Sequence, residues 1–422
     1  SFSSSTANYN VAVGFNAGLS VTTGVENTLI GALAGDAITS SADNTAVGYQ
    51  ALGSATTGNE NTAVGHSALF TNILSDRNVA LGLDTLRNHN QASSIDSYNV
   101  AVGYNTGAAV TTGVQNTLIG ALAGDALTDA DYNVAIGYSS LSADTLGSKS
   151  TAIGVGALES QRPVDGSGND VATDMYNTAV GYTAGLSVST GTINTLVGAL
   201  AGDAITTGSE NAALGYESAG ELTVGVKNTA LGAYALRVDT EGSQSVAVGH
   251  QALAAQNFTS ATTAYNVAVG ANAGLSVTTG VENTLVGGFA GDALTTGGNN
   301  VAVGKSALTT ETGASSSVAI GKEALRNQNV DSGNSGNAYN VSVGFEAGKL
   351  VSTGVENTLV GASAGDALTD ADFNVAIGYT ALSTDELGSR STAIGYAALL
   401  AQSNSSAADA NNTAVGYIAG TA

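Results

Sequence analysis

Three short motifs in this 422-residue chain match, in full or in part, sequences that other proteins use for catalysis or phosphate binding. Residues 361–365 (Gly-Ala-Ser-Ala-Gly) match the Gly-x-Ser-x-Gly turn that exposes a nucleophilic serine between a strand and a helix. Residues 304–306 (Gly-Lys-Ser) and 348–349 (Gly-Lys) lack the earlier glycine of a phosphate-binding loop. Ser363 occupies the position that Leu33, Leu122, Leu200 and Phe289 occupy in the other blocks, so we interpret all three motifs as parts of a repeat.

The remaining candidates for catalysis are few. His66 and His250 occupy one repeat position, and His89 falls in a polar segment between repeats, so the three imidazoles form neither a metal site nor a triad. The chain has no cysteine, which excludes a thiol nucleophile, a thiolate metal site and a disulfide. We therefore predict that the chain is not an enzyme.

Five aspartates recur at one position, two coils into each block of repeats. The interpretation that we favour is a turn aspartate that follows glycine and accepts backbone N–H bonds. The alternative is a cation site, with Ca²⁺ as the candidate ion, where several chains meet on an axis. Further acids one coil along, in two blocks, keep that alternative open, and no other cofactor is expected. The five residues are Asp36, Asp125, Asp203, Asp292 and Asp366, and the further acids are Asp129, Asp131, Asp370 and Asp372.

An aromatic side chain follows the repeat glycine in ten coils. Such a stripe can stack on sugars or on a receptor, but aromatic residues more often pack at a coil edge or between subunits. The ten residues are Phe15, Tyr49, Tyr104, Tyr138, Tyr182, Tyr216, Phe345, Tyr379, Tyr396 and Tyr417.

All these residues belong to one repeat, Asn-(Thr/Val)-Ala-(Val/Ile/Leu)-Gly, which occurs 23 times. Seventeen of the 22 intervals between its glycines are 17 residues long. So short a period is typical of stacked coils, none of which buries its apolar face alone. The sequence therefore predicts an all-β fold, a repetitive parallel β-solenoid with 17-residue coils.

Numbering each coil from its asparagine gives specific expectations for the strand. The residues at positions 2 and 4 are mostly β-branched, and we expect them to face the coil interior, with positions 1, 3 and 5 facing the other way. Because position 3 is also apolar, we expect that second face to be covered by other chains or by a second wall of the same chain. Turn residues in the second half of each coil suggest two short strands and two turns per coil.

Three positions predict how the coils pack. Glycine is invariant at position 5, so either its φ is positive or a Cβ would strike a neighbouring backbone. Position 8 holds only alanine, serine or threonine, which indicates a thin interior. Asparagine at position 1 should form a ladder of amide hydrogen bonds from coil to coil. Examples of these structural residues are Asn27, Gly31, Asn44, Gly48, Asn61 and Gly65.

Position 9 reveals a longer period. Each block begins with two coils that have glycine at position 9. Two or three coils follow, and all but one of these have leucine at position 9. Each longer interval, with four to ten extra polar residues, follows the last coil of such a block, and we expect these segments to leave the stack as loops. Two of them are 87–97 and 159–175. We predict an entry segment (1–8), block 1 (9–97), block 2 (98–175), block 3 (176–264), block 4 (265–338), block 5 (339–410) and the start of block 6 (411–422), in one continuous rod that is a fragment of a longer fibre.

Composition limits the partners. The net charge of −23, from 34 acidic and 11 basic residues, argues against nucleic acid and keeps a long assembly soluble. No apolar run reaches the roughly 18 residues that a bilayer-spanning helix needs, so we expect no membrane insertion.

Residues 44–52 (Asn-Thr-Ala-Val-Gly-Tyr-Gln-Ala-Leu), 61–65 (Asn-Thr-Ala-Val-Gly) and 150–154 (Ser-Thr-Ala-Ile-Gly) resemble two repeat families. One is the repeat shaft of bacteriophage tail fibres, and the other is the left-handed parallel β-roll head of trimeric autotransporter adhesins. The resemblance implies a left-handed β-roll and a homotrimer. It also implies a structural shaft of an extracellular, cell-surface or virion fibre that also adheres to a host glycan or protein receptor. The regular spacing and the boundary loops favour a fibre shaft over an adhesin head.

The alternative is a monomeric β-solenoid whose flat face binds ice or another regular surface. Threonine recurs at position 2, as such a face would need, although valine or alanine often replaces it.

Overall fold

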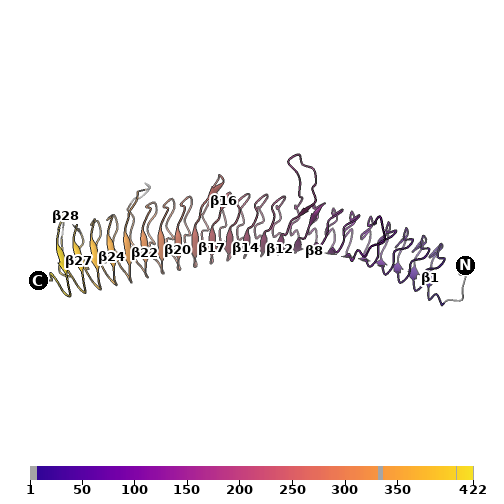
Figure 1. The fold of residues 1–422 in the computed structure, drawn as a ribbon, viewed down its shortest axis with the longest axis horizontal. Helices are drawn as coiled ribbons and strands as arrows, with labels where there is room; N and C mark the ends of the chain where they lie inside the picture. Colours follow the sequence, from indigo (N-terminus) through magenta and orange to yellow (C-terminus); the bar gives the residue numbers. More distant parts are fainter. Residues whose placement is uncertain (1–6, 331–335, 405, 422) are drawn as a thin grey trace. The chain divides into compact units, whose positions relative to one another are not determined.

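The computed structural model describes residues 7–330, 336–404 and 406–421. Most of the predicted entry segment (1–8) and part of the predicted boundary segment after block 4 (331–335) lie outside these residues. The described chain contains strands, turns and no helix, which confirms the all-β class (Figure 1). By its internal contacts the chain divides into two units, Ser1–Asn211 and Ala212–Ala422, and the division falls inside the predicted block 3.

Each unit is a stack of coils with one three-residue strand per coil. The described strands of the first unit are β1 (Val11–Val13), β2 (Thr28–Ile30), β3 (Thr45–Val47), β4 (Thr62–Val64), β5 (Val79–Leu81), β6 (Val100–Val102), β7 (Thr117–Ile119), β8 (Val134–Ile136), β10 (Thr151–Ile153), β12 (Thr178–Val180) and β13 (Thr195–Val197), with two-residue strands β9 (Gly147–Ser148) and β11 (Thr173–Asp174). Those of the second unit are β14 (Ala212–Leu214), β15 (Thr229–Leu231), β17 (Val246–Val248), β19 (Val267–Val269), β20 (Thr284–Val286), β21 (Val301–Val303), β22 (Val318–Ile320), β23 (Val341–Val343), β24 (Thr358–Val360), β25 (Val375–Ile377), β27 (Thr392–Ile394) and β29 (Thr413–Val415), with two-residue strands β16 (Gly242–Ser243), β18 (Thr262–Thr263), β26 (Gly388–Ser389) and β28 (Ala408–Asp409).

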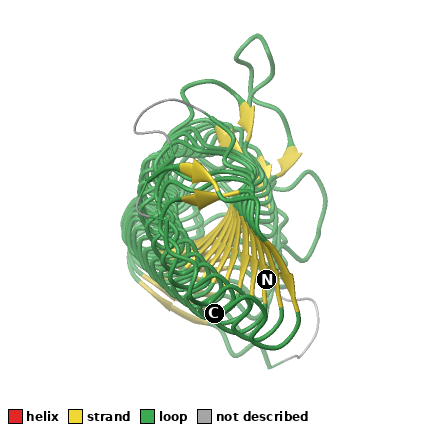
Figure 2. Cartoon of the chain, turned by 90° about the vertical axis from the view of Figure 1, so that its left-hand side faces the viewer, coloured by secondary structure: helices red, strands yellow, loops and turns green. Residues whose placement is uncertain are grey.

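Neighbouring strands within each unit pair in parallel and in register, so each repeat position stacks on itself. In β3 and β4, for example, Thr45 pairs with Thr62 and Ala46 with Ala63. Figure 2, which looks onto the coils, shows the strands aligned on one side of the coil section, while loops and turns form the rest. The predicted parallel β-solenoid with 17-residue coils is thus confirmed.

The predicted orientation of the strands is wrong. Ala46, at position 3, is fully buried, whereas Thr45 and Val47, at positions 2 and 4, are only half-buried, and this pattern recurs along both units. The interior is narrow and already holds the position-1 asparagine, so the small position-3 residue fits inside and the β-branched residues alternate outward. None of the three strand residues is charged or strongly polar, so the pattern cannot by itself identify the inner face.

The predicted second strand in every coil is also wrong. Within the described ranges, two-residue second strands occur only at three boundaries, as the parallel pairs β9–β11, β16–β18 and β26–β28. The chain turns through residues with left-handed backbone at positions 7, 9 and 17, such as Gln50 (φ 56°), Leu52 (φ 51°) and Glu60 (φ 56°). The coil that contains β9 bends in the same way, so these residues shape the turns of both kinds of coil.

Position 5 needs glycine for both of the predicted reasons. Gly48 has a φ of +134°, and a Cβ built on it would lie 2.5 Å from the carbonyl oxygen of Gly65 in the next coil. The same backbone-to-backbone approach recurs through both stacks. Position 8 is equally tight, because Ala51 and its equivalents are fully buried.

Position 9 alternates between glycine and leucine because a coil has room for one leucine at a time beside its strand. Leu29 fills the interior of its coil from position 3, and a Cβ on Gly35 would lie 2.8 Å from its Cδ2. In the following coil the strand residue is Ala46, and Leu52 at position 9 fills the interior instead, fully buried. These two coils therefore fill one space in two ways, and Leu29 also reaches the coil before it, where a Cβ on Gly18 would lie 2.8 Å from its Cδ1.

The predicted boundary loops are partly confirmed. Residues near Val164–Asp170, joined by an antiparallel bridge, extend away from the coils as the long purple loop in Figure 1. The predicted limits were too wide, however, because His89, Gln161 and Met175 are fully buried inside the stack. Position 12 of a boundary coil thus belongs to the interior, and only the residues beyond it can leave the stack.

Candidate functional site

A ladder of asparagines runs through the interior, as predicted. The backbone N–H of Asn44 donates to Oδ1 of Asn27 at 3.1 Å, and its Nδ2 donates to the same oxygen at 3.1 Å and to the Gly58 carbonyl at 3.0 Å. These side chains are almost completely buried. Because each amide saturates a backbone group of its own coil and bonds to the preceding coil, the ladder fixes both the turn and the stacking.

Serine interrupts this ladder at Ser150, where a buried cluster replaces it. Nε2 of Gln161 donates to Oγ of Ser150 at 2.9 Å and to Oδ2 of Asp144 at 2.5 Å. Oε1 of Gln161 accepts from Nδ2 of Asn177 at 2.9 Å, which restarts the ladder. The other oxygen of Asp144 accepts the N–H of Gly147 at 2.7 Å. The cluster therefore joins two coils of block 2 to the first coil of block 3.

The same cluster of an acid, a serine and a glutamine occurs at four boundaries, and the sequence analysis missed it. At the second of them Nε2 of Gln256 donates to Asp239 at 2.6 Å and to Ser245 at 3.0 Å. The signal was available, because in each case the acid precedes the serine by six residues and the glutamine follows it by eleven. The members are Asp144, Ser150 and Gln161; Asp239, Ser245 and Gln256; Glu311, Ser317 and Gln328; and Asp385, Ser391 and Gln402.

The first block lacks this cluster. Asn72 stands where the acid stands elsewhere, and His89 stands where the glutamine stands. His89 is buried, and neither of its ring nitrogens has a hydrogen-bond partner. Asn78 remains at position 1, and its Oδ1 continues the ladder across the boundary by accepting the backbone N–H of Asn99 at 3.2 Å. The first boundary is therefore joined by the ladder itself.

Burial shifts the titration of these inner groups in opposite directions. Desolvation raises the pKa of Asp144 to about 6, although the Gln161 amide and the Gly147 N–H both favour the ionised form. The pKa of Asp239 is raised for the same reason. Desolvation lowers the pKa of His89 to about 4. The interior thus holds carboxyl groups whose pKa values are raised and an imidazole whose pKa is lowered.

The five recurrent aspartates lie one to a block, in the turn that follows position 9. Their backbone carbonyls accept N–H groups of the preceding coil, as Asp36 does from Ser20 at 3.1 Å and Asp125 from Ala109 at 3.1 Å. Desolvation raises the pKa of Asp125 and Asp366, and each has one buried carboxylate oxygen without a partner. No group of three or more histidines and acids that could hold a metal ion occurs in the described ranges.

The motif around Ser363 lies in a repeat turn. Ser363 has a φ of 54° and donates its N–H to the Phe345 carbonyl at 2.9 Å. Leu33, at the same position in another block, has a φ of 58° and donates to Phe15 at 2.8 Å. Lys349 forms ion pairs with Glu323 and Glu346 at 3.1 and 3.2 Å. The backbone contact of Ser363 thus repeats between blocks, as predicted for a repeat residue.

The aromatic stripe lies on the outside, next to the strands. Tyr379, Tyr396 and Tyr417 stack on one another, with ring centroids 5.5 and 5.1 Å apart and planes within 20°. Tyr49 contacts His66 of the next coil at 5.2 Å. Because the faces of these tyrosine rings pack against one another, a ligand would contact mainly the ring edges and the hydroxyl groups.

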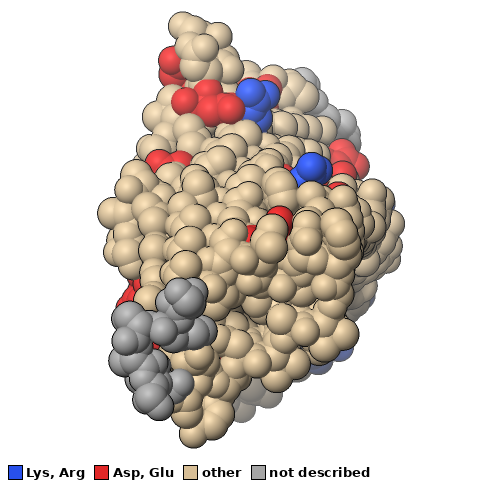
Figure 3. All heavy atoms as spheres, turned by 90° about the vertical axis from the view of Figure 1, so that its right-hand side faces the viewer, with Lys and Arg blue, Asp and Glu red and all other residues tan. Residues whose placement is uncertain are grey.

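The outward side of the strands forms an uncharged face in each unit. We call the side chains at positions 2 and 4 the outward sheet face. Position 2 holds only threonine, valine or alanine and position 4 only valine, isoleucine or leucine in all 23 coils. Ile30 is 39% exposed and Ile119 is 38% exposed. Figure 3 shows a largely uncharged surface on which charged side chains gather in a few places.

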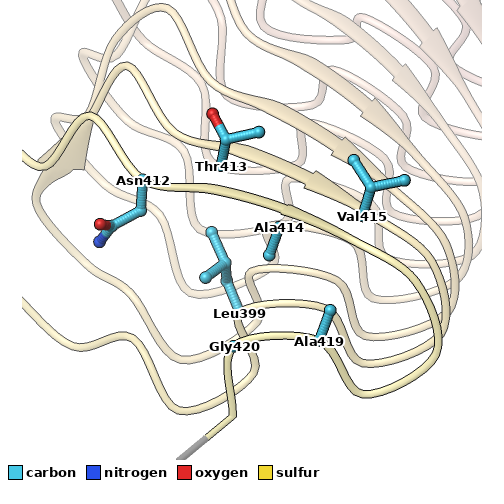
Figure 4. A pocket seen from close by; sticks show the side chains of 7 residues that line it. All are labelled: Leu399, Asn412, Thr413, Ala414, Val415, Ala419 and Gly420. Atoms are coloured by element: carbon cyan, nitrogen blue, oxygen red, sulfur yellow. The ribbon is translucent and has the colours of Figure 1, made fainter.

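A pocket opens at the last described coil of the second unit (Figure 4). It is lined by Leu399, Asn412 and Ala414 together with Thr413, Val415, Ala419 and Gly420. Asn412, Ala414 and Gly420 occupy positions that are buried in the inner coils, so the pocket is the interior of the stack seen at its end.

Searches of family models and of curated proteins found no match to this chain. Among the described residues, no helix has the length and apolarity that crossing a bilayer requires.

Proposed function

We propose that the chain is a structural shaft of an extracellular, cell-surface or virion fibre, assembled as a homotrimer. The observation that supports this is the coil-to-coil bonding, in which the asparagine ladder and the position-5 glycines hold each coil against its neighbour. Such a stack resists bending at every coil and presents loops at its block boundaries. In this proposal those loops, such as the one near Val164–Asp170, contact a host glycan or protein receptor.

The test is the mass and form of the purified chain in solution. We expect light scattering to give three times 41.2 kDa and negative-stain electron microscopy to show thin particles of uniform length. A compact particle, or a range of lengths caused by bending, would contradict the shaft. A different but constant mass would contradict the trimer alone.

A second candidate function, binding to ice or another regular surface by a monomer, gains support from one observation. Threonine at position 2 points outward, so Thr45, Thr62 and their equivalents repeat along an exposed sheet. The test is thermal hysteresis of the monodisperse chain. We expect none, and a clear freezing-point depression would favour this candidate.

A further inference from the structure

We propose that further copies of the same chain cover the outward sheet face of each unit, so that this face is the interface of the fibre. The inference rests on the proposed self-association and adds which surface carries it. It differs from the sequence-based expectation, which assigned the contact between chains to position 3. That position lies in the interior, so a contact between chains must use positions 2 and 4.

The charge distribution favours a second copy as the partner. The chain carries a net charge of −23, yet the outward sheet face has no charged side chain in any coil. Like-charged copies can approach only through a surface free of acids, because directly opposed like charges destabilise an interface. A basic partner would instead be drawn to the acidic positions elsewhere.

The area of the face also fits a stable interface. Eleven coils in the first unit, spaced by roughly 4.8 Å, give a strip of about 50 Å. Together with its rim at position 6, the outward sheet face spans about 14 Å across the strip, so the face and its rim cover roughly 700 Å². A standard interface buries about 800 Å² per partner, whereas the largest apolar patch of a monomer is about 300–600 Å².

Symmetry makes the contact possible along the whole strip. Copies related by rotation about an axis parallel to the stack place like coils at the same height. Each outward residue then meets its equivalents, as valine, isoleucine and leucine at position 4 would do around such an axis. The aromatic residues at position 6 would lie at the rim, where polar edges remain in water.

The test compares two lysine variants of equal net charge in the full chain. Ile30→Lys with Ile119→Lys places charges on the outward sheet face, and Ser40→Lys with Thr190→Lys places them at position 14 of coils in the same unit. Natural acids occupy position 14 at Asp129 and Asp370, so this position tolerates charge. Both variants lower the repulsion between copies, so only a loss of contacts at the face can dissociate them.

We expect analytical ultracentrifugation to show association about tenfold weaker or worse for the face variant and unchanged for the position-14 variant. If the wild type associates and both variants behave alike, the face is not the interface, while the proposed shaft stands. If the wild type is a monomer, the proposed self-association fails together with this inference, and thermal hysteresis of that monomer would assign the face to ice.

A milder variant keeps the test valid if the lysines prevent folding, which circular dichroism would show. The chain has no cysteine, so Ile30→Cys and Ser40→Cys each introduce a single thiol. A bismaleimide that spans about 10 Å should link copies of the Ile30→Cys chain and leave copies of the Ser40→Cys chain separate. Equal linking of the two, or none at Ile30→Cys, would overturn the assignment.

Discussion

Adjacent glycines with opposite surroundings show what position 5 requires. Gly287 has a φ of +133°, and a Cβ on it would lie 2.6 Å from the carbonyl oxygen of Gly304. Gly288, the next residue, has open space, with its nearest contact at 3.8 Å. We expect Gly287→Ala to destabilise the second unit by several kcal/mol, on the order of 3, because either the backbone conformation or the coil spacing must change.

The matched control is Gly288→Ala, which should change stability by less than about 0.5 kcal/mol. Urea unfolding followed by circular dichroism measures both variants. Similar midpoints for the two would show that the stack can absorb an extra methyl group at position 5.

Leu29 at position 3 and Gly35 at position 9 are a second pair of residues that depend on each other, because they share one space in the coil. Gly35→Leu alone should be strongly destabilising, because its side chain would overlap Leu29. Leu29→Ala alone should cost about 2–5 kcal/mol through the cavity that it leaves. The double variant copies positions 3 and 9 of the next coil, although Ile38 stays where that coil has Ala55. Its cost should be at least about 1 kcal/mol below the sum of the two.

A double-mutant cycle from urea midpoints measures this coupling. Strict additivity would mean that the two side chains do not share one space. Rescue should remain incomplete, because Leu29 also contacts the region of Gly18 in the preceding coil.

The boundary cluster that contains Asp144 should make the stability of block 2 increase in mild acid. Burial raises the folded-state pKa of Asp144 to about 6, above its unfolded value of 3.8, so the folded state binds the proton more tightly. Its contribution to stability is therefore greatest in acid, falls as pH rises from about 4 to 6, and is lowest at pH 7. The difference is about 3 kcal/mol.

Unfolding midpoints at pH 7 and pH 5 test this prediction. The gain in stability on acidification should be smaller in Asp144→Asn than in the wild type. Asp129→Asn, which changes an exposed acid nearby, should keep the full gain. An equal gain in all three proteins would mean that Asp144 is already solvated.

The first boundary should respond in the opposite sense. The folded-state pKa of His89 is about 4, below its unfolded value of 6.5, so the unfolded chain binds the proton first. Its contribution to stability is present above pH 6.5 and is lost as pH falls toward 4, by about 3 kcal/mol. Limited proteolysis between pH 7 and pH 4.5 should reveal earlier cleavage near this boundary.

Replacing His89 with Gln, the residue of the other boundaries, should abolish that acid sensitivity. Substitution of the exposed His66 by Gln is the control and should leave it in place. If the His89→Gln chain is cleaved as fast as the wild type in acid, the sensitivity arises elsewhere.

The elements also show what the sequence could predict. The 17-residue period fixed the parallel stack, the ladder and the glycine contacts, because each depends on one residue type at one position. The inner face of the strand was not predictable in the same way, since Thr45, Ala46 and Val47 all suit either side. The boundary cluster stayed hidden because Asp144 and Gln161 are polar residues in a polar segment, and only the fold places them inside.

At the scale of the whole molecule, the net charge of −23 makes association depend on salt. The screening length falls from about 30 Å at 0.01 M salt to about 10 Å at 0.1 M. We therefore expect copies of the chain to associate more tightly at 150 mM than at 10 mM sodium chloride, as measured by sedimentation. Weaker association at the higher concentration would indicate that opposite charges, and not an uncharged face, join the copies.

The third coils of blocks 1 and 3, which begin at Asn44 and Asn211, explain how such a chain can change length. Each fills its interior with small residues and one leucine, Leu52 or Leu222, and each is the extra coil that makes its block longer than the others. Neither contributes to the glycine pair that opens its block or to the buried residue at its end, His89 in block 1 and Asp239 in block 3. A gene could therefore gain or lose these 51 bases in one recombination event, and the lineage would inherit a longer or shorter protein in which the two flanking coils form the same kind of coil-to-coil contact.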